Sequence, residues 1–337
     1  MSVIMNKNIW IKRRERMATI NQVKELLKAH FSGDGDKFKV IALQIAAHEA
    51  KVGHTNSARE IKALVENSPL AKNNVVKFNN SNKSLGLKYS DIGIEKLVVS
   101  NSLKNKIDRI ISEYKKRDVL LKNGLKNRSK LLLEGNPGTG KTMTASVIAY
   151  ELGLPLYSVQ IHHLISKYMG ETSVKLKKIF DQIREYRGVY LFDEFDAIGS
   201  DRSFDNDVGE MRRILNSFLQ YIEEDDSASI IICATNNPNM LDKALFRRFD
   251  DVFEYKLPDK EQIVRLIEIN LYGLDFKNII TENVINNSLG LSHADIVTAC
   301  KEAKKYVLLN DKKIYETILL DFIKERKQFL QYKEVSQ

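Results

Sequence analysis

The chain of 337 residues, 43% hydrophobic and 29% charged, is long enough for one large globular domain and a smaller one. Two cysteines, no long apolar run and no signal peptide exclude a disulfide framework and a membrane-inserted protein, so we expect a cytoplasmic chain with reduced thiols. The 53 Lys and Arg against 44 Asp and Glu give a net charge of +9, which by itself does not decide between nucleic-acid contact and the more common solvated surface or subunit contact.

The first predicted elements are three short helices. Residues 1–16 are expected to be a tail, because Met17 is a plausible alternative start. Apolar residues recur at helical spacing over Ile20–Phe31, and two further helical patterns follow before Pro69. We expect residues 17–69 to form a three-helix domain that recruits a substrate or adaptor. Residues 70–90 are rich in Asn, Lys and Ser, which indicates a linker.

Beyond the linker, short apolar runs alternate with helical patterns. The runs are Lys130–Glu134, Leu156–Ile161, Gly188–Phe192 and Ile230–Ala234. This alternation predicts an α/β subdomain over residues 91–258, with a parallel sheet between two layers of helices. After Pro258 the pattern is helical throughout, which predicts a C-terminal helical lid subdomain over residues 259–337.

A glycine-rich segment after the first of these runs matches the P-loop pattern in full. Its glycines let main-chain N–H groups wrap a triphosphate, and the following helix contributes a favourable N-terminal field. Lys141 supplies a positive charge to the phosphates, and the Thr142 hydroxyl is available to Mg²⁺. The predicted ATP-binding residues are Gly135, Asn136, Pro137, Gly138, Thr139, Gly140, Lys141, Thr142 and Met143.

Two carboxylates follow the apolar strand that ends at Phe192. Because side chains alternate along a strand, Asp193 and Glu194 leave it in different directions. Asp193 is suited to the Mg²⁺ shell, and Glu194 to polarising the attacking water. A third strand carries Asn236 at its tip, where an amide can position that water, although Asn236-Asn237-Pro238 also suits a turn.

These segments and two others resemble the AAA family of AAA+ ATPases. The matching segments are Gly135–Thr142, Leu191–Gly199, Ala234–Asn236, Leu241–Asp250 and Gly290–Ile296. They occur in the family's order, and the resemblance runs from about Asp91 to the end of the chain. It implies ATP and Mg²⁺ as ligands, and a sensor role for Asn236.

The resemblance also implies sites shared between subunits. Arg247 and Arg248 fall at the position of the family's arginine fingers, which reach the ATP of a neighbouring subunit; a solvated basic pair is the alternative. A site completed in this way implies a homo-oligomeric ring, typically a hexamer. Lys167, Tyr168 and Met169 resemble the pore loop that grips a polypeptide substrate, although Tyr168 also suits a helix surface.

Some residues depart from the family pattern. The adjacent Arg247 and Arg248 resemble the severing and disassembly branch rather than the commoner Arg-Pro-Gly-Arg. His293 stands where a glycine is common, and no arginine in the helix after it suits a sensor 2 role. A glycine is missing after Asp91-Ile92-Gly93, which leaves the adenine pocket undefined.

Three functions remain open on the sequence. The first is a protein remodeller that unfolds, threads or disassembles a polypeptide, working with a separate protease in some arrangements. The second is a nucleic-acid motor or loader, which the basic charge favours. The third is a regulatory switch whose ATP-driven assembly controls a partner enzyme. The chain has no protease motif of its own and no histidines at metal-binding spacing.

Overall fold

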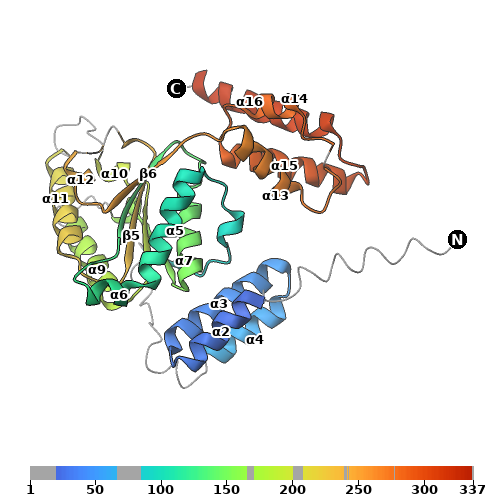
Figure 1. Cartoon of the computed structure of the whole chain (residues 1–337). Coiled ribbons are helices and arrows are strands. Elements are labelled where there is room, and N and C mark those ends of the chain that lie inside the picture. Colours follow the sequence, from blue (N-terminus) through green and yellow to red (C-terminus); the bar gives the residue numbers. More distant parts are fainter. Residues whose placement is uncertain are drawn as a thin grey trace.

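The computed structural model describes residues 20–66, 85–164, 171–199, 208–238, 241, 243–276 and 278–335. Within these ranges the chain forms an N-terminal helical bundle, an α/β subdomain and a C-terminal helical subdomain (Figure 1). The predicted fold class is confirmed. No helix in these ranges is long and apolar enough to cross a membrane.

The N-terminal bundle consists of α2 (Ile20–Phe31), α3 (Gly35–Val52) and α4 (Thr55–Glu66). Asp34 caps α3 by accepting a hydrogen bond from the Lys37 N–H, and Gly53, with a φ of +96°, ends it. The bundle contacts the α/β subdomain through an ion pair of 2.5 Å between Lys51 Nζ of α3 and Asp91 Oδ1.

The sheet has the strand order β1-β3-β4-β5-β2-β6. Its strands are β1 (Leu85–Lys88), β2 (Lys130–Gly135), β3 (Leu156–Gln160), β4 (Val189–Asp193), β5 (Ile230–Thr235) and β6 (Asp251–Tyr255). The four predicted strands are present and pair in parallel, and β6 extends the sheet beside β2. β6 was not among the predicted strands, and residues 85–88, which were predicted to belong to the linker, form β1, antiparallel to β3.

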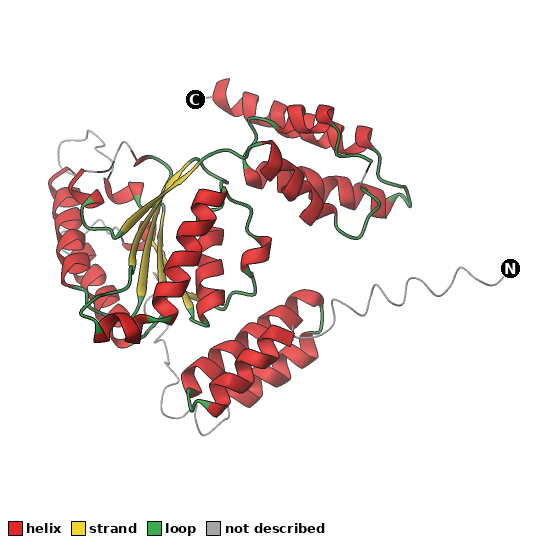
Figure 2. Ribbon diagram, viewed as in Figure 1, coloured by secondary structure: helices red, strands yellow, loops and turns green. Residues whose placement is uncertain are grey.

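Helices cover both faces of the sheet, as Figure 2 shows. On one face lie α5 (Asn101–Lys115) and α7 (Lys141–Leu152), and on the other α9 (Glu171–Glu185) and α11 (Val208–Glu224). Along β2, Leu132 packs against α9 and α11, whereas Leu131 and Leu133 pack against α5 and α7. Burial on both faces explains why the strands are apolar without alternation.

Five shorter helices complete the α/β subdomain in the described ranges: η2 (Ile94–Lys96), α6 (Arg117–Lys122), α8 (Ile161–Leu164), α10 (Asp196–Gly199) and α12 (Lys243–Phe246).

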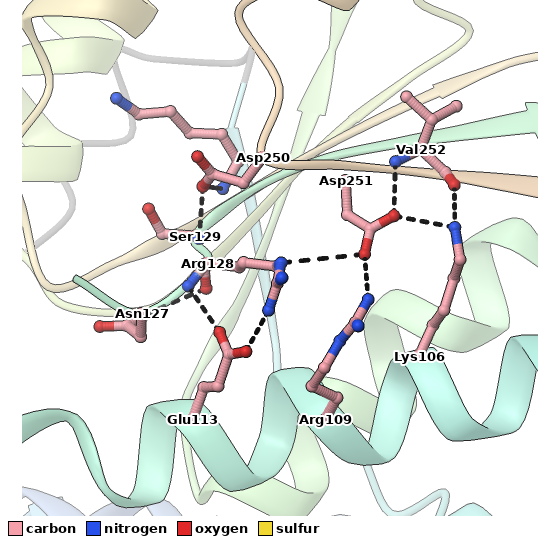
Figure 3. Close-up of polar contacts among 10 residues, drawn as sticks. Lys106, Arg109, Glu113, Asn127, Arg128, Ser129, Asp250, Asp251 and Val252 are labelled. Carbon is pink, nitrogen blue, oxygen red and sulfur yellow. Dashed lines mark hydrogen bonds and ion pairs between the residues drawn. The ribbon is translucent and has the colours of Figure 1, made fainter. Parts of the chain in front are cut away.

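Ion pairs tie α5 to the edge strand β6 (Figure 3). The Asp251 carboxylate accepts hydrogen bonds from Lys106 Nζ at 2.8 Å and Arg109 Nη2 at 2.7 Å. Burial raises the pKa of Asp251, but Lys106 and Arg109 outweigh this effect and hold it below its ordinary value. The cluster fixes β6 against α5 next to the strand that carries the glycine-rich loop.

The C-terminal subdomain consists of α13 (Lys260–Leu271), α14 (Glu282–Ser288), α15 (His293–Leu309) and α16 (Glu316–Val335). Capping boxes start two of its helices: Asp259 with Gln262 at α13, and Ser292 with Asp295 at α15. The four helices share one apolar core, which includes Cys300. Cys300 and Cys233 are both buried and unpaired.

Candidate nucleotide site

The predicted phosphate-binding loop joins the end of β2 to the start of α7. Gly138 and Gly140 have φ angles of +76° and +106°, a conformation that side chains disfavour and that lets the loop curl back over the helix N-terminus. Thr139 is buried and its hydroxyl donates to the Asn136 carbonyl at 2.7 Å, which closes the loop on itself. Met143 follows in the first turn of α7, half-buried.

Lys141 lies inside this loop. Its Nζ donates to the carbonyl oxygens of Gly135 at 2.5 Å and Asn136 at 2.9 Å. Burial lowers the pKa of the ammonium group, while the carboxylates of Asp193 and Asp196 act in the opposite direction. A cation is thus placed at the mouth of the loop, where a phosphate would meet it.

A hydroxyl and a carboxylate meet beside this loop. Thr142 Oγ1 donates to Asp193 Oδ2 at 2.8 Å, and Asp193 Oδ1 accepts from the Glu194 N–H at 3.0 Å. Thr142 is exposed and Asp193 half-buried, so their oxygens form an accessible donor set of the hard kind that Mg²⁺ prefers. The residues present therefore fit the predicted metal.

Glu194 has a φ of +55°, in the left-handed region that a non-glycine residue rarely adopts. The turn directs the chain away from β4 immediately after Asp193. Backbone strain of this type costs about 1–3 kcal/mol and is concentrated at functional sites. It supports the assignment of Glu194 to the reacting centre.

Asp196 links the end of β4 to the tip of β5. Its Oδ1 accepts from the Asn236 N–H and from Thr235 Oγ1, both at 3.2 Å. Because β5 lies between β4 and β2 in the sheet, Asn236 comes to the same edge as Lys141. Asp196 was not among the predicted site residues, although its position three residues after Asp193, near a strand end, could have indicated a role.

Arg247 and Arg248 lie outside this cluster. Both are exposed and follow α12, which lies with α10 and α11 in Figure 1. Arg248 Nη2 forms an ion pair of 3.0 Å with Glu223 of α11. Within the described ranges neither arginine forms a hydrogen bond or ion pair with Gly135–Thr142. The predicted pore-loop residues Lys167, Tyr168 and Met169 lie outside the described residues.

The C-terminal subdomain contacts the loop directly. The Ala294 N–H donates to the Gly138 carbonyl at 3.0 Å. A Cβ on Gly138 would lie 2.6 Å from Ser292 Oγ, so this position has room only for glycine. His293 is buried next to this contact, and burial lowers its pKa to about 4, while Asp259 acts in the opposite direction.

A cavity of about 560 Å³ lies between the sheet and the C-terminal subdomain. Its walls include Glu134, Thr139, Glu254 and His293. Burial and the charge of Glu254, its in-register neighbour on β6, raise the pKa of Glu134. Thr139 belongs to the predicted phosphate loop, so the cavity adjoins this loop, whereas Lys141 and Asp193 are not among its walls.

Comparisons with known proteins give similar sequences and a similar fold. The ATPase family associated with various cellular activities (AAA) matches residues 131–257. An uncharacterised AAA family ATPase of Sinorhizobium fredii, y4kL, is 32% identical over 88% of this chain and 92% of its own length. A proteasome-activating nucleotidase of Methanosphaerula palustris is 31% identical over 66% of this chain, which spans 55% of that protein. The crystal structure of the FIGL-1 AAA domain has the same fold, with a TM-score of 0.60 at 22% identity over 77% of this chain and 91% of its own.

Proposed function

Because the chain belongs to the AAA family of ATPases, and is accordingly a P-loop ATPase, we propose that it uses ATP hydrolysis to unfold, thread or disassemble protein substrates. The observation that carries the ATPase site is the meeting of Lys141, Thr142 and Asp193 at one sheet edge. The protein-remodelling part is supported by the similarity to proteasome-activating nucleotidases.

We propose the following roles at the site. Main-chain N–H groups of Gly135–Thr142 hold the phosphates, and Lys141 exchanges its loop carbonyls for phosphate oxygens. Thr142 and Asp193 would hold Mg²⁺, which neutralises phosphate charge when bound. Glu194 accepts a proton from the attacking water. Asn236 orients that water, with Asp196 holding its backbone.

We propose that the chain forms a homo-oligomeric ring, expected to be a hexamer, and that each site is completed by a residue of the neighbouring subunit. Arg247 is exposed and has no ion-pair partner among the described residues, so it is available to a neighbouring subunit. Arg248 is already paired with Glu223 in its own subunit. These environments favour Arg247 as the residue that reaches the neighbouring nucleotide.

We propose that the N-terminal bundle binds the protein partner. Four large apolar side chains on α2 are spaced so that they fall on one helix face, and all are exposed: Ile20, Val23, Leu27 and Phe31. Phe31 is 82% exposed, although a stripe of this kind is normally buried. Lys24 and Lys28 border the stripe on the same helix. This surface suits a partner helix with an apolar face and acidic flanks.

ATPase stimulation tests the proposal and separates it from its rivals. A permanently unfolded protein should raise the ATPase rate, and Tyr168→Ala should abolish the increase. Tyr315→Ala, which removes an exposed tyrosine of the C-terminal subdomain, is the matched control. Leu27→Asp should also lose the stimulation, whereas Arg59→Ala on α4 should retain it. Stimulation by DNA or RNA instead, falling steeply with salt, would identify a nucleic-acid motor.

A partner protease is tested separately. If the ring delivers substrate to a protease, the chain alone should hydrolyse ATP and unfold a tagged substrate without cleaving it. If ATP drives assembly and no substrate is unfolded under any condition, the chain is a regulatory switch. Neighbouring genes that encode a protease would favour the first arrangement.

A further inference from the structure

We propose that Arg326 of α16 is a positioning residue that holds the first turn of α15 against Gly138 and thereby sets the affinity of the loop for nucleotide. The inference rests on the proposed role of Gly135–Thr142 as the phosphate loop. Arg326 is far in sequence from this loop and is not among the residues of the predicted nucleotide site.

The starting point is the contact between the loop and α15. The Ala294 N–H donates to the Gly138 carbonyl at 3.0 Å, and Ser292 lies directly against the Gly138 Cα. The two subdomains therefore touch at Gly138 of the loop. Any change in the position of the α15 first turn must shift Gly138 or break this hydrogen bond.

The α15 first turn is held by a capping box. Asp295 N–H donates to Ser292 Oγ at 3.2 Å, and Ser292 N–H and Oγ donate to Asp295 Oδ2 at 3.3 and 2.6 Å. Ser292 and Asp295 are each 8% exposed, so water competes little for these bonds. The capping box thus sets where Ser292 and Ala294 meet the loop.

Arg326 holds the second oxygen of the same carboxylate. Its Nη2 donates to Asp295 Oδ1 at 2.6 Å, and its guanidinium lies 5.3 Å from the centre of the Phe329 ring. One carboxylate oxygen of Asp295 therefore accepts hydrogen bonds from Ser292 in the capping box, and the other accepts one from Arg326 of α16. Burial raises the pKa of Asp295, but the hydrogen bonds from Ser292 and Arg326 outweigh burial and keep the carboxylate ionised.

These contacts form a continuous path from α16 to the loop: Arg326, Asp295, Ser292 and Gly138. In this structure Lys141 Nζ donates to two carbonyl oxygens of the loop. For Lys141 to donate to a phosphate instead, the loop must change its conformation. A first turn held by Arg326 limits which loop conformations are available. Nucleotide binding and the placement of the C-terminal subdomain are therefore coupled through one carboxylate.

The test compares Arg326→Gln and Arg326→Lys with Lys324→Gln, an exposed position on the same helix, in the full chain. The KM for ATP should rise about tenfold in Arg326→Gln, while kcat stays within about twofold. Arg326→Lys should recover part of the affinity, because an ammonium still pairs with a carboxylate but lacks the planar fork. Lys324→Gln should leave KM unchanged.

The pH dependence of KM distinguishes this positioning role from a purely structural one, because loss of a purely structural residue would not change it. Without Arg326, the pKa of Asp295 rises, so the carboxylate is protonated at a higher pH than in the native chain. In Arg326→Gln the acid-induced increase in KM should therefore begin at a higher pH than in the native chain. Equal pH profiles would overturn the inference.

A double-mutant cycle keeps the test decisive if one variant folds poorly. Asp295→Asn combined with Arg326→Lys should raise KM no more than Asp295→Asn alone, because both changes act on one path; additive effects would overturn the inference. A lowered melting temperature with an unchanged KM would also overturn it. Lys141→Ala separates the two claims. If it still binds nucleotide, the proposed loop itself is wrong. If it loses binding while Arg326→Gln keeps a native KM, only the Arg326 inference fails.

Discussion

Thr142 donates a hydrogen bond of 2.8 Å to Asp193, and this contact joins the start of α7 to the end of β4. The two residues are 51 positions apart in the chain, and the parallel arrangement of β2 and β4 around β5 brings them to one sheet edge. Their oxygens have different roles in the proposal, since the hydroxyl is neutral and the carboxylate supplies the charge that attracts Mg²⁺. Removing the charge of Asp193 is therefore a sharper test of the proposed Mg²⁺ site than removing the Thr142 hydroxyl.

Asp193→Asn should weaken Mg²⁺ dependence. The amide keeps the shape and one acceptor oxygen but loses the negative charge, so the Mg²⁺ concentration for half-maximal ATPase activity should rise on the order of 10- to 100-fold. Titration of activity with Mg²⁺ at fixed ATP measures this. Asp181→Asn, an exposed carboxylate on α9, is the control. An unchanged titration would contradict the assignment of Asp193.

Asp196→Ala should slow turnover and spare binding. Asp196 holds the Asn236 backbone and the Thr235 hydroxyl at 3.2 Å, and loss of hydrogen bonds to a charged group costs about 1.5–3 kcal/mol. We expect kcat to fall about 10- to 100-fold, with nucleotide affinity within about twofold. Asp196→Asn keeps one acceptor oxygen and should lose less. If affinity falls as much as kcat, Asp196 supports the loop rather than Asn236.

Much of the fold could be predicted because the buried strands have no competing interpretation. Lys130–Glu134 and Ile230–Ala234 are apolar throughout, and each precedes a motif residue at its carboxyl end. β6 was missed because Asp251 and Glu254 interrupt it. It is an edge strand, and Asp251 pairs with Lys106 and Arg109 of α5, a contact that periodicity cannot reveal.

The residues of the candidate site could be proposed from the sequence, but the contacts between them could not. Lys141, Asp193 and Glu194 follow from motif chemistry that needs no tertiary information. The role of Asp196 depends on contacts with residues 39 and 40 positions away, and the roles of Gly138 and Ser292 depend on their contact with each other. No local pattern encodes these contacts. The absence of an obvious sensor arginine in α15 gave no hint that Arg326 of α16 contacts the start of that helix.

Gly138→Ala should impair nucleotide binding more than its backbone strain alone explains. The added Cβ would lie 2.6 Å from Ser292 Oγ and 3.0 Å from the Ala294 Cβ, so the loop and α15 must separate. Gly124→Ala is a matched control, since Gly124 has a φ of +71° against +76° for Gly138 but has open space around it. Both variants should lose stability by similar amounts, measured by thermal unfolding. Only Gly138→Ala should raise the Kd for ATP, and equal Kd values in both would contradict the contact.

Acid should weaken the attachment of β6 to α5. The folded-state pKa of Asp251 lies below its ordinary value of 3.8, so the stabilisation is fully present above that value and is lost as the pH falls through the lowered folded-state pKa. Asp251→Asn should therefore lower the melting temperature at neutral pH and flatten its decline in acid. Asp108→Asn, an exposed carboxylate on α5, should leave the native pH dependence intact. An Asp251→Asn curve parallel to the native one would argue against this ion-pair cluster.

Arg247→Ala should abolish hydrolysis without abolishing binding, and mixing should reveal shared sites. An arginine that stabilises the transferring phosphoryl group contributes about 10³–10⁵ in rate, so the variant should be nearly inactive with a native Kd for ATP. Glu194→Gln should likewise bind ATP without turning it over. In a mixed ring, some sites combine the native Glu194 of an Arg247→Ala subunit with the native Arg247 of a neighbouring Glu194→Gln subunit, so part of the activity should return.

Arg248→Ala is the informative comparison, because Arg248 is held by Glu223 in its own subunit and its loss should reduce activity less. Mixtures as inactive as either variant would indicate that each site is complete within one chain.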